Sequence, residues 1–448
     1  MGNSTQVPPG PKGKFLTGNL SLFSKNPLGF LHKCSREYGD IVRIAKFSYL
    51  INQPELIEQI LHNKDSLFEK VDPALAQKNH TAFSEAVMNS SGAEWQLKRR
   101  HLQPSFNKIL IRENIAKTLS TTEHFLGNWQ YKPAIQNFRH EIALLSMEVG
   151  SQYLFGTAAT SDEMLKITRM VEAIMTLTRN QVRLPLFIPS KNNLRLHKAR
   201  YEVDEVINRI ISRYKKLTIS QTCVLDGLLA EDESGNSKWI HDEIATMIMS
   251  GFEPMADALT WTCYLLALHP ECKRKLVEEV DIIFSEQGGV SASSISMLKY
   301  TEAVIKESLR LYPPAWMTGR TAVKECIFSG YHVPKGVTMI VSPWVTHRDP
   351  RYFEQPDEYY PARWLKDNFV EKLPKYAYFP FGGGLRKCIG DYLIMTQMIT
   401  IVASIFHKYN LRLTPDSTVT PYPALVLRPL GVEMLVELRL SSFVRSRT

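Results

Sequence analysis

The sequence FGGGLRKCIG, at residues 381–390, is the most informative stretch of this chain. It places Cys388 in a glycine-rich loop, two residues after Arg386 and directly before an apolar run. Glycines let a loop turn tightly and bring its backbone close to a flat cofactor. A thiolate at the start of a helix is stabilised by the helix dipole and by loop N–H groups, which makes Cys388 a candidate soft metal ligand. Taken alone, such a cysteine is more often a structural thiol.

A second pattern, Glu307-Ser308-Leu309-Arg310, predicts a paired acid and base on one helix face, because their side chains are three residues apart. The flanking residues are apolar and Pro313 follows shortly, so we expect a buried helix that ends at proline. Most such pairs lie at the surface and contribute little. A buried pair needs further hydrogen-bond partners to offset its desolvation.

A third pattern is a long, mostly apolar helix predicted from about His241 to Leu268, with Asp242 and Glu243 near its start, where acids suit the helix dipole. In its middle, Pro254 has no N–H and cannot bond to the carbonyl of Ser250. We therefore expect a kink or a widened turn at this point.

The motif F-x-x-G-x-R-x-C-x-G resembles the haem-ligand loop of the cytochrome P450 monooxygenases, and the other patterns follow in the family's order over nearly the whole chain. The resemblance implies a mainly α fold with small β-sheets (α+β). It also implies haem b, held between the long central helix and the Cys-loop helix. Cys388 is the expected iron ligand, within a loop that includes Phe381, Gly384 and Gly390.

The resemblance also implies roles for basic residues. Trp95 and Arg99 lie four residues apart, so both can reach one haem propionate, and Arg320 and Arg386 match further propionate contacts. Arg363 would complete a structural cluster with the Glu307–Arg310 pair. The family's usual glutamate two residues before Trp364 is Ala362 here.

The central helix of the family normally carries small residue–Gly–x–acid–Thr, and this chain departs from that pattern. Gly251 and the acid Glu253 are present, but Pro254 replaces the threonine, so these three are the predicted catalytic residues. Two interpretations stay open. Pro254 can exaggerate an existing bend, with water or a substrate hydroxyl replacing the threonine. Alternatively, normal oxygen scission is impaired and the enzyme performs peroxide-driven oxidation, rearrangement or coupling.

The function implied is hydroxylation or epoxidation of a lipophilic small molecule, such as a terpenoid, fatty acyl, polyketide or aromatic compound, with dioxygen. Electrons would come from a ferredoxin or flavodoxin and its reductase, since the chain has no flavin or nicotinamide motif. A reductant-independent isomerase or dehydratase, and a non-catalytic haem sensor, are alternatives. Residues expected to contact substrate, each equally a core candidate, are Phe252, Met255, Ala256, Ala315, Trp316, Met317 and Leu425, with weaker candidates Met88, Phe83 and residues 182–186.

Composition agrees with one large domain over residues 1–448, comprising a β-rich region of about residues 1–70, a large helical region and a C-terminal sheet. Hydrophobic residues make up 44% of the chain, enough for a deep core. The six cysteines show no framework spacing and predict free thiols. No stretch reaches the roughly eighteen apolar residues that a membrane span needs, and no signal-peptide core is present. We expect a soluble, cytoplasmic, monomeric enzyme of secondary metabolism without a transmembrane anchor.

The net charge of +9 raises the question of a partner. No basic–aromatic motif supports nucleic-acid binding. By the resemblance, two basic regions border the face where an acidic electron-transfer protein docks, and complementary charge would speed that encounter. Solubility is the alternative explanation. The basic residues concerned are Lys98, Arg99, Arg100, Lys108, Arg112, Lys375, Arg386 and Lys387.

The coarse secondary structure predicted is mostly helical, with helices over 27–38, 54–63, 95–129, 136–155, 162–180, 194–217, 241–285, 295–312 and 389–408. Strands are expected at 41–52 and 327–342 and in a C-terminal sheet near 410–440.

Overall fold

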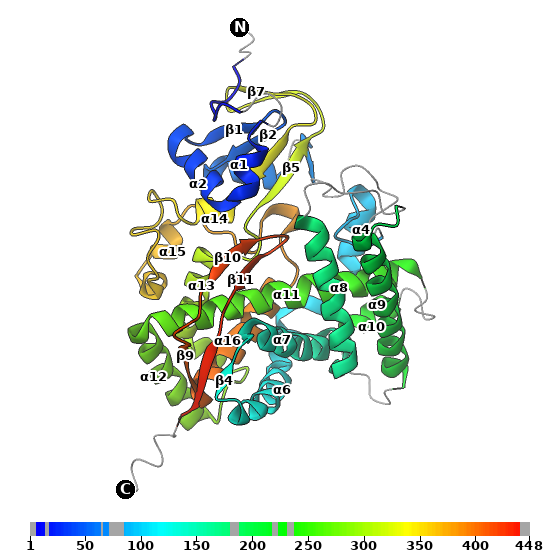
Figure 1. Cartoon of the computed structure of the whole chain (residues 1–448), viewed down its shortest axis with the longest axis vertical. Coiled ribbons are helices and arrows are strands. Elements are labelled where there is room, and N and C mark those ends of the chain that lie inside the picture. Colours follow the sequence, from blue (N-terminus) through cyan, green and yellow to red (C-terminus); the bar gives the residue numbers. More distant parts are fainter. Residues whose placement is uncertain are drawn as a thin grey trace. The chain divides into compact units, whose positions relative to one another are not determined.

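The computed structural model describes residues 6–13, 18–63, 66–70, 85–179, 188–216, 223–230 and 237–439. It is mainly helical with small sheets, which confirms the predicted fold class (Figure 1). The chain divides into two compact units, which we call unit 1 (residues 1–75 and 306–388) and unit 2 (residues 76–305 and 389–448). The interpretation as a single domain stays a prediction. The weaker substrate candidates Phe83 and 182–186 lie outside the described residues.

Unit 1 is built around a five-stranded sheet of order β1-β2-β8-β5-β3. Strands β2 and β8 pair in parallel and the other neighbours are antiparallel. Its apolar face packs on the buried side of α3, where Ile57 and Ile60 are fully buried. The elements are α1 (Leu20–Lys25), α2 (Pro27–Tyr38), β1 (Ile41–Ala45), β2 (Ser48–Ile51), α3 (Pro54–His62), β3 (Phe68–Lys70), β5 (Thr318–Ala322), β6 (Cys326–Phe328), β7 (Tyr331–Val333), β8 (Thr338–Val341), α14 (Pro343–Thr346) and α15 (Phe369–Lys372). Helix α13 (Lys299–Leu311) spans the point where the sequence passes from unit 2 to unit 1.

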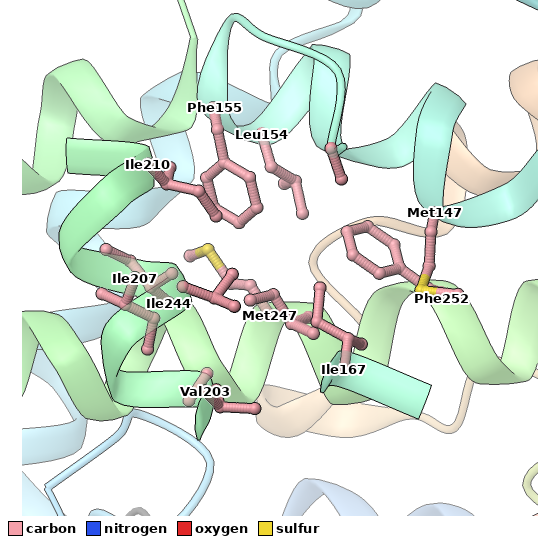
Figure 2. Close-up of a cluster of buried hydrophobic side chains, with 14 of the residues drawn as sticks. Met147, Leu154, Phe155, Ile167, Val203, Ile207, Ile210, Ile244, Met247 and Phe252 are labelled. Carbon is pink, nitrogen blue, oxygen red and sulfur yellow. The ribbon is translucent and has the colours of Figure 1, made fainter. Parts of the chain in front are cut away.

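Unit 2 is helical, and its long helix α11 packs against α7. A buried apolar cluster fills the space between them, with Ile244 and Met247 from α11 and Leu154 and Phe155 from α7 (Figure 2). The helices are α4 (Gly92–Leu102), α5 (Lys108–Glu113), α6 (Ile115–Gly127), α7 (Phe138–Phe155), α8 (Ser161–Arg179), α9 (Lys191–Lys215), α10 (Val224–Leu229), α11 (Lys238–Leu268), α12 (Pro270–Gln287) and α16 (Asp391–Lys408). Two small sheets contain β4 (Ala134–Ile135), β9 (Tyr409–Leu413), β10 (Thr420–Pro423), β11 (Leu427–Leu430) and β12 (Met434–Leu438).

Prolines divide two of the predicted helices. The predicted helix at 95–129 is interrupted by a 3-10 turn at Gln103–Phe106, which contains Pro104. The predicted helix at 241–285 is in fact α11 and α12, because Pro270 begins α12 and the preceding residue His269 leaves the helical conformation.

Helix α11 continues as one α-helix through Pro254, so the widened turn predicted there is not found, and a bend stays a prediction. Among the described residues, no helix has both the length and the apolar character to cross a membrane.

Candidate functional site

The glycine-rich loop presents Cys388 as an exposed thiol at the end of unit 1. The loop is closed by its own backbone, since the N–H of Cys388 donates to the carbonyl of Phe381 at 3.0 Å. Gly384 has φ +66°, and a Cβ at this position would lie 2.0 Å from the carbonyl oxygen of Leu61. Only glycine allows this close approach. All six cysteines lie in the described part of the chain and none forms a disulfide; the five others are buried or half-buried.

Two side chains accept hydrogen bonds from backbone N–H groups of the loop. The hydroxyl of Tyr376 accepts the N–H of Gly384 at 3.0 Å, and Nε2 of His347 accepts the N–H of Phe379 at 2.9 Å. Burial, with the charges of Arg310 and Arg348, lowers the pKa of His347 well below its usual value. The imidazole is therefore neutral and its lone pair is available to the loop. This role could not be predicted from the sequence, because nothing in the local sequence links His347 to residue 379.

The buried acid of the second pattern is surrounded by donors. Glu307 accepts hydrogen bonds from Arg310 (Nε 2.9 Å, Nη2 2.8 Å) and from Nε of Arg363 at 3.0 Å. It also accepts from the N–H of Tyr360 and from Nε1 of Trp364, both at 2.9 Å. We call these residues the Glu307 cluster. Each carboxylate oxygen is bound by more than one donor, as a buried charge requires.

The Glu307 cluster is connected to the cysteine loop within unit 1. Nη1 of Arg310 donates to the carbonyl of His347 at 2.9 Å, and Nη2 donates to the carbonyl of Glu358 at 2.8 Å. The ring of His347 in turn accepts the N–H of Phe379. A continuous series of hydrogen bonds therefore runs from the cluster to the loop that carries Cys388. Hydrogen bonds thus join the cluster to the loop, and a role of the cluster in positioning the loop stays a prediction.

Two guanidinium groups of unit 1 suit a ligand with two carboxylates. Arg320, on β5, is 8% exposed, and its side chain donates to the carbonyl of Gly319 at 2.8 Å. Burial and then the charge of Arg386 lower the pKa of Arg320 to about 10. Two cations that raise each other's energy in a buried position fit a dianionic group such as the two propionates of haem.

The predicted propionate residues of unit 2 lie on α4. Trp95 and Arg99 are one turn apart and half-buried, and Nε of Arg99 donates to Oε1 of Gln103 at 3.2 Å. Their convergence with the arginines of unit 1, and contacts of Gly390 with haem, stay predictions.

The middle of α11 has one accessible face. Ser250 is exposed and Gly251 and Pro254 are half-buried, whereas the neighbouring positions Phe252 and Met255 are buried. The hydroxyl of Ser250 donates to the carbonyl of Thr246 at 2.7 Å. The groups at residues 250, 251 and 254 are small, which suits the approach of a flat cofactor with dioxygen.

Glu253 is buried in unit 2 and is ion-paired rather than free. Its Oε2 accepts hydrogen bonds from Nη2 of Arg139 and, at 2.6 Å, from Nη2 of Arg428. Nε of Arg139 also donates to Oδ1 of Asp257 at 2.6 Å. Burial raises the pKa of Asp257 to about 7, although Arg139 opposes the shift. Sequence reasoning missed Asp257; an acid one turn after Glu253 in an apolar helix was the available signal.

The two acids at the start of α11 also bind backbone groups rather than only the helix dipole. Oδ2 of Asp242 accepts the N–H of Glu85 at 3.0 Å, and Oε2 of Glu243 accepts the N–H of Val87 at 2.6 Å. Burial raises the pKa of Glu243 to about 7. Both acids therefore fix the segment 85–90 against α11.

The predicted substrate residues have different environments. The ring of Phe252 packs against Gly150 of α7, where an added Cβ would lie 2.4 Å from the ring, and beside Met147 (Figure 2). This placement favours a core role for Phe252. The other buried candidates are Met255, Ala256 and Trp316, the last stacked on Phe23 with ring centroids 6.5 Å apart. The accessible candidates are Ala315, Met317, Leu425 and Met88. Substrate contact stays a prediction for the whole set.

Comparison with known proteins agrees with this arrangement. The family model described as Cytochrome P450 matches residues 8–436. The chain is 30% identical over 442 residues to cyclooctatin synthase of Streptomyces melanosporofaciens, and this alignment covers 96% of this chain and 95% of the relative. It is 30% identical over 415 residues to cyclooctat-9-en-7-ol 5-monooxygenase of the same organism (90% and 89%), and 26% identical over 416 residues to pentalenene oxygenase of Streptomyces avermitilis (91% of each). The chain therefore belongs to the cytochrome P450 family and is a haem-thiolate monooxygenase, an oxidoreductase that uses dioxygen and a redox partner.

Proposed function

We propose that this P450 hydroxylates or epoxidises a terpenoid in secondary metabolism. The observation that carries the proposal is near-full-length similarity to three bacterial oxygenases named for cyclooctatin and pentalenene compounds, which are terpenoids. A terpenoid hydrocarbon offers mainly apolar surface, so its burial would drive binding. The accessible and buried candidate substrate residues are mostly apolar, which supports this choice.

The haem is held in this proposal by Cys388 as iron ligand, with Arg320, Arg386, Trp95 and Arg99 on its propionates. The bound haem supplies oxygen activation, which electron donation from a thiolate favours. The protein's own part is to orient the thiol: Phe381 holds the N–H of Cys388, and Tyr376 and His347 hold the turns before it.

We assign proton handling to Glu253, the acid that the family pattern retains. Both guanidinium hydrogen bonds go to its Oε2, so Oε1 is the oxygen at which a proton can be taken up and released. Gly251 and Pro254 are half-buried on α11 and carry no hydroxyl group, and the hydroxyl of Ser250 donates to the carbonyl of Thr246. A substrate hydroxyl or a water would take the position of the missing threonine alcohol.

The decisive experiment is a panel of cyclic terpene hydrocarbons and alcohols, with fatty acids and polyketides for comparison. We expect a low-to-high spin shift with terpenoids and oxygenated products that require reductant and dioxygen. Spin shifts and products only with fatty acids or polyketides would contradict the proposed substrate class.

Pro254 supports a second candidate function, in which peroxide-driven oxidation, rearrangement or coupling replaces ordinary oxygen activation. The two candidates differ in their need for reductant. If product forms with hydrogen peroxide alone and not with a reduced redox partner, the second candidate is correct. Replacing Pro254 with Thr tests its contribution: unchanged turnover and unchanged product yield per electron would mean that Pro254 does not tune oxygen activation.

We further propose a ferredoxin or flavodoxin, with its reductase, as the electron donor. In unit 2, Nζ of Lys108 lies 5.3 Å from the ring centre of Tyr392 on α16, and Nε of Arg112 donates to the hydroxyl of the same tyrosine at 2.9 Å. Two exposed cations are thus fixed at the start of the helix that follows Cys388. Lys98 contributes less positive charge to this surface, because its side chain is only 12% exposed and forms an ion pair with Glu94.

The charge of this surface is tested by reduction kinetics. We expect the rate of reduction by a ferredoxin to fall steeply with salt, and to fall further when Lys108 and Arg112 are both replaced by Glu. The matched control replaces Arg195 and Lys198, two exposed cations of α9, both by Glu, which changes the net charge by the same amount. Equal effects of the two charge reversals would contradict guided docking at α5.

A further inference from the structure

Helix α11 carries a second buried acid outside the five-residue family pattern. Asp257 is fully buried and lies one turn after Glu253. Arg139, near the start of α7, reaches both acids: its Nη2 donates to Oε2 of Glu253 and its Nε donates to Oδ1 of Asp257. Helices α7 and α11 pack side by side in unit 2 (Figure 1). One guanidinium is therefore shared between two carboxyl groups.

The shared cation spans the turn that contains Pro254. Glu253 precedes the proline and Asp257 follows it, whereas the proline itself has no N–H to bond to the preceding turn. Arg139 thus links the helix on both sides of Pro254 through side chains. A change in the bond to either acid alters how that turn is held.

A second cation completes the charge balance. Arg428, on β11, donates from Nη2 to Oε2 of Glu253 at 2.6 Å. Strand β11 is fixed to α11, because Nε1 of Trp261 donates to the carbonyl of Leu427 at 3.1 Å. With Asp257 ionised, two cations face two carboxylates; with Asp257 neutral, Glu253 faces both cations alone.

The network is incomplete in a way that matters for Asp257. Among the described residues, Oδ2 of Asp257 and Nε of Arg428 have no hydrogen-bond partner. The charged groups that act on Asp257 from α7, α11 and β11 are Arg139, Glu253 and Arg428. Burial disfavours the charged form of Asp257 and raises its pKa into the neutral range. Oδ2 is thus an oxygen where a proton from water can reside near neutral pH.

We propose that Asp257 is a positioning residue for Glu253, acting through Arg139 and in a manner that depends on its own proton. As a carboxylate, Asp257 binds Nε of Arg139 and shares that cation with Glu253. As a neutral acid, it leaves the cation to Glu253, which is then held more firmly. The inference rests on the proposed role of Glu253 in proton handling.

The primary test is the pH dependence of product formed per electron consumed, in the haem-loaded enzyme with its redox partner. In the wild type we expect this yield to rise several-fold through neutral pH, as Asp257 ionises and Glu253 is held less firmly by the shared Arg139. Asp257→Asn, a permanently neutral group, is expected to hold the yield at its low-pH value throughout. A pH profile of Asp257→Asn that matches the wild type would overturn the proposal.

Glu243→Gln is the matched control, because Glu243 is also a buried acid of α11 with a raised pKa but binds the N–H of Val87 rather than an arginine. We expect this variant to keep the wild-type profile. Loss of the pH dependence in Glu243→Gln as well would show a general effect of buried acids and contradict the specific role of Asp257.

A spectroscopic readout is independent of turnover. Infrared difference spectra of the haem-loaded enzyme without substrate should contain a protonated-carboxyl band that titrates near neutral pH and is missing in Asp257→Asn. Arg139→Lys keeps a cation, but its single nitrogen cannot occupy the positions of both Nε and Nη2; this variant should retain the band and lose the pH dependence of product yield. Absence of a band removed by Asp257→Asn would overturn the proposal even if that variant were poorly active.

Glu253→Gln separates this inference from its premise. If turnover is unchanged in that variant, Glu253 does not handle protons and the proposed function of that residue fails. The infrared result for Asp257 would then still report whether it titrates near neutral pH.

Discussion

Two buried networks of acids and arginines differ in how fully the oxygens of their carboxyl groups are hydrogen-bonded. In the Glu307 cluster of unit 1, one carboxylate receives five hydrogen bonds, two from Arg310 and one each from Arg363, Tyr360 and Trp364. In unit 2, the pair Glu253 and Asp257 shares Arg139, and within the part of the chain that the structure describes Oδ2 of Asp257 has no hydrogen-bond partner. Burial of a charge is costly unless every lone pair is satisfied. A complete network fixes structure, and an incomplete one leaves a group that can titrate.

The largest effect is expected from Glu307→Gln. This change keeps the side-chain shape but leaves two buried guanidinium groups without their anion, so we expect a loss of about 3–5 kcal/mol in the free energy of unfolding. Urea unfolding measures it, and haem retention should weaken in parallel because the cluster supports the loop of Cys388. A loss below about 1 kcal/mol would mean that the Glu307 cluster contributes no more than an ordinary surface ion pair, which would contradict its assignment as a complete buried network.

Glu243 extends the comparison to a buried acid whose hydrogen-bond donor is a backbone N–H, and Glu243→Gln tests its contribution. The pKa of Glu243 is raised from 4.5 to about 7, so the unfolded chain releases this proton at lower pH than the folded chain. The free energy of unfolding of the wild type therefore falls as pH rises through this window, by an amount on the order of 3 kcal/mol from this group alone. The glutamine variant keeps the bond to Val87 and lacks this fall. Equal pH slopes for the two proteins would contradict the expectation.

Trp364→Phe removes one donor from the complete network and leaves the other four. Nε1 of Trp364 donates to Oε2 of Glu307 at 2.9 Å in a buried position. Hydrogen bonds to charged groups contribute about 1.5–3 kcal/mol, so we expect a loss of about 2 kcal/mol, smaller than that of Glu307→Gln. Thermal and urea unfolding of both variants gives the ranking; a reversed order would mean that the tryptophan acts mainly through packing.

The smallest effect on stability is expected from Asp257→Asn at slightly acidic pH. Asp257 is largely neutral there, and a neutral amide of nearly the same shape replaces it, so the free energy of unfolding should change by less than about 1 kcal/mol. Urea unfolding alongside Glu307→Gln provides the contrast. If Asp257→Asn destabilises as much as Glu307→Gln, the two networks do not differ in kind.

Much of the fold and of the thiolate loop was predictable from local sequence. Glycines with a single cysteine define the loop, and three-residue spacing placed Glu307 with Arg310 on one helix face. Helix α2 matches its predicted residues 27–38, because Asn26 caps it and Pro27 starts it. The family and haem thiolate followed from the same residues and are confirmed.

The partners of buried charges could not be predicted, since they are distant in sequence. Arg139 and Arg428 lie 114 and 175 residues from Glu253, and His347 lies 32 residues from the N–H that it accepts. Periodicity reports which face of a helix is buried, but it does not report which side chain meets it there. Phe252 illustrates the same limit: its apolar side chain beside Glu253 suggests a substrate contact, which stays a prediction, and the sequence alone does not reveal that its ring packs against Gly150.

The neutral imidazole that holds the cysteine loop sets a lower limit on the pH at which the enzyme keeps its prosthetic group. His347 can accept the N–H of Phe379 only while Nε2 carries no proton. In the unfolded chain this ring gains a proton below its ordinary value of 6.5, whereas the folded chain resists until the medium is much more acidic. Acidification below that value therefore favours an open loop, and release of the iron porphyrin in mild acid should begin at this turn rather than in the helical body.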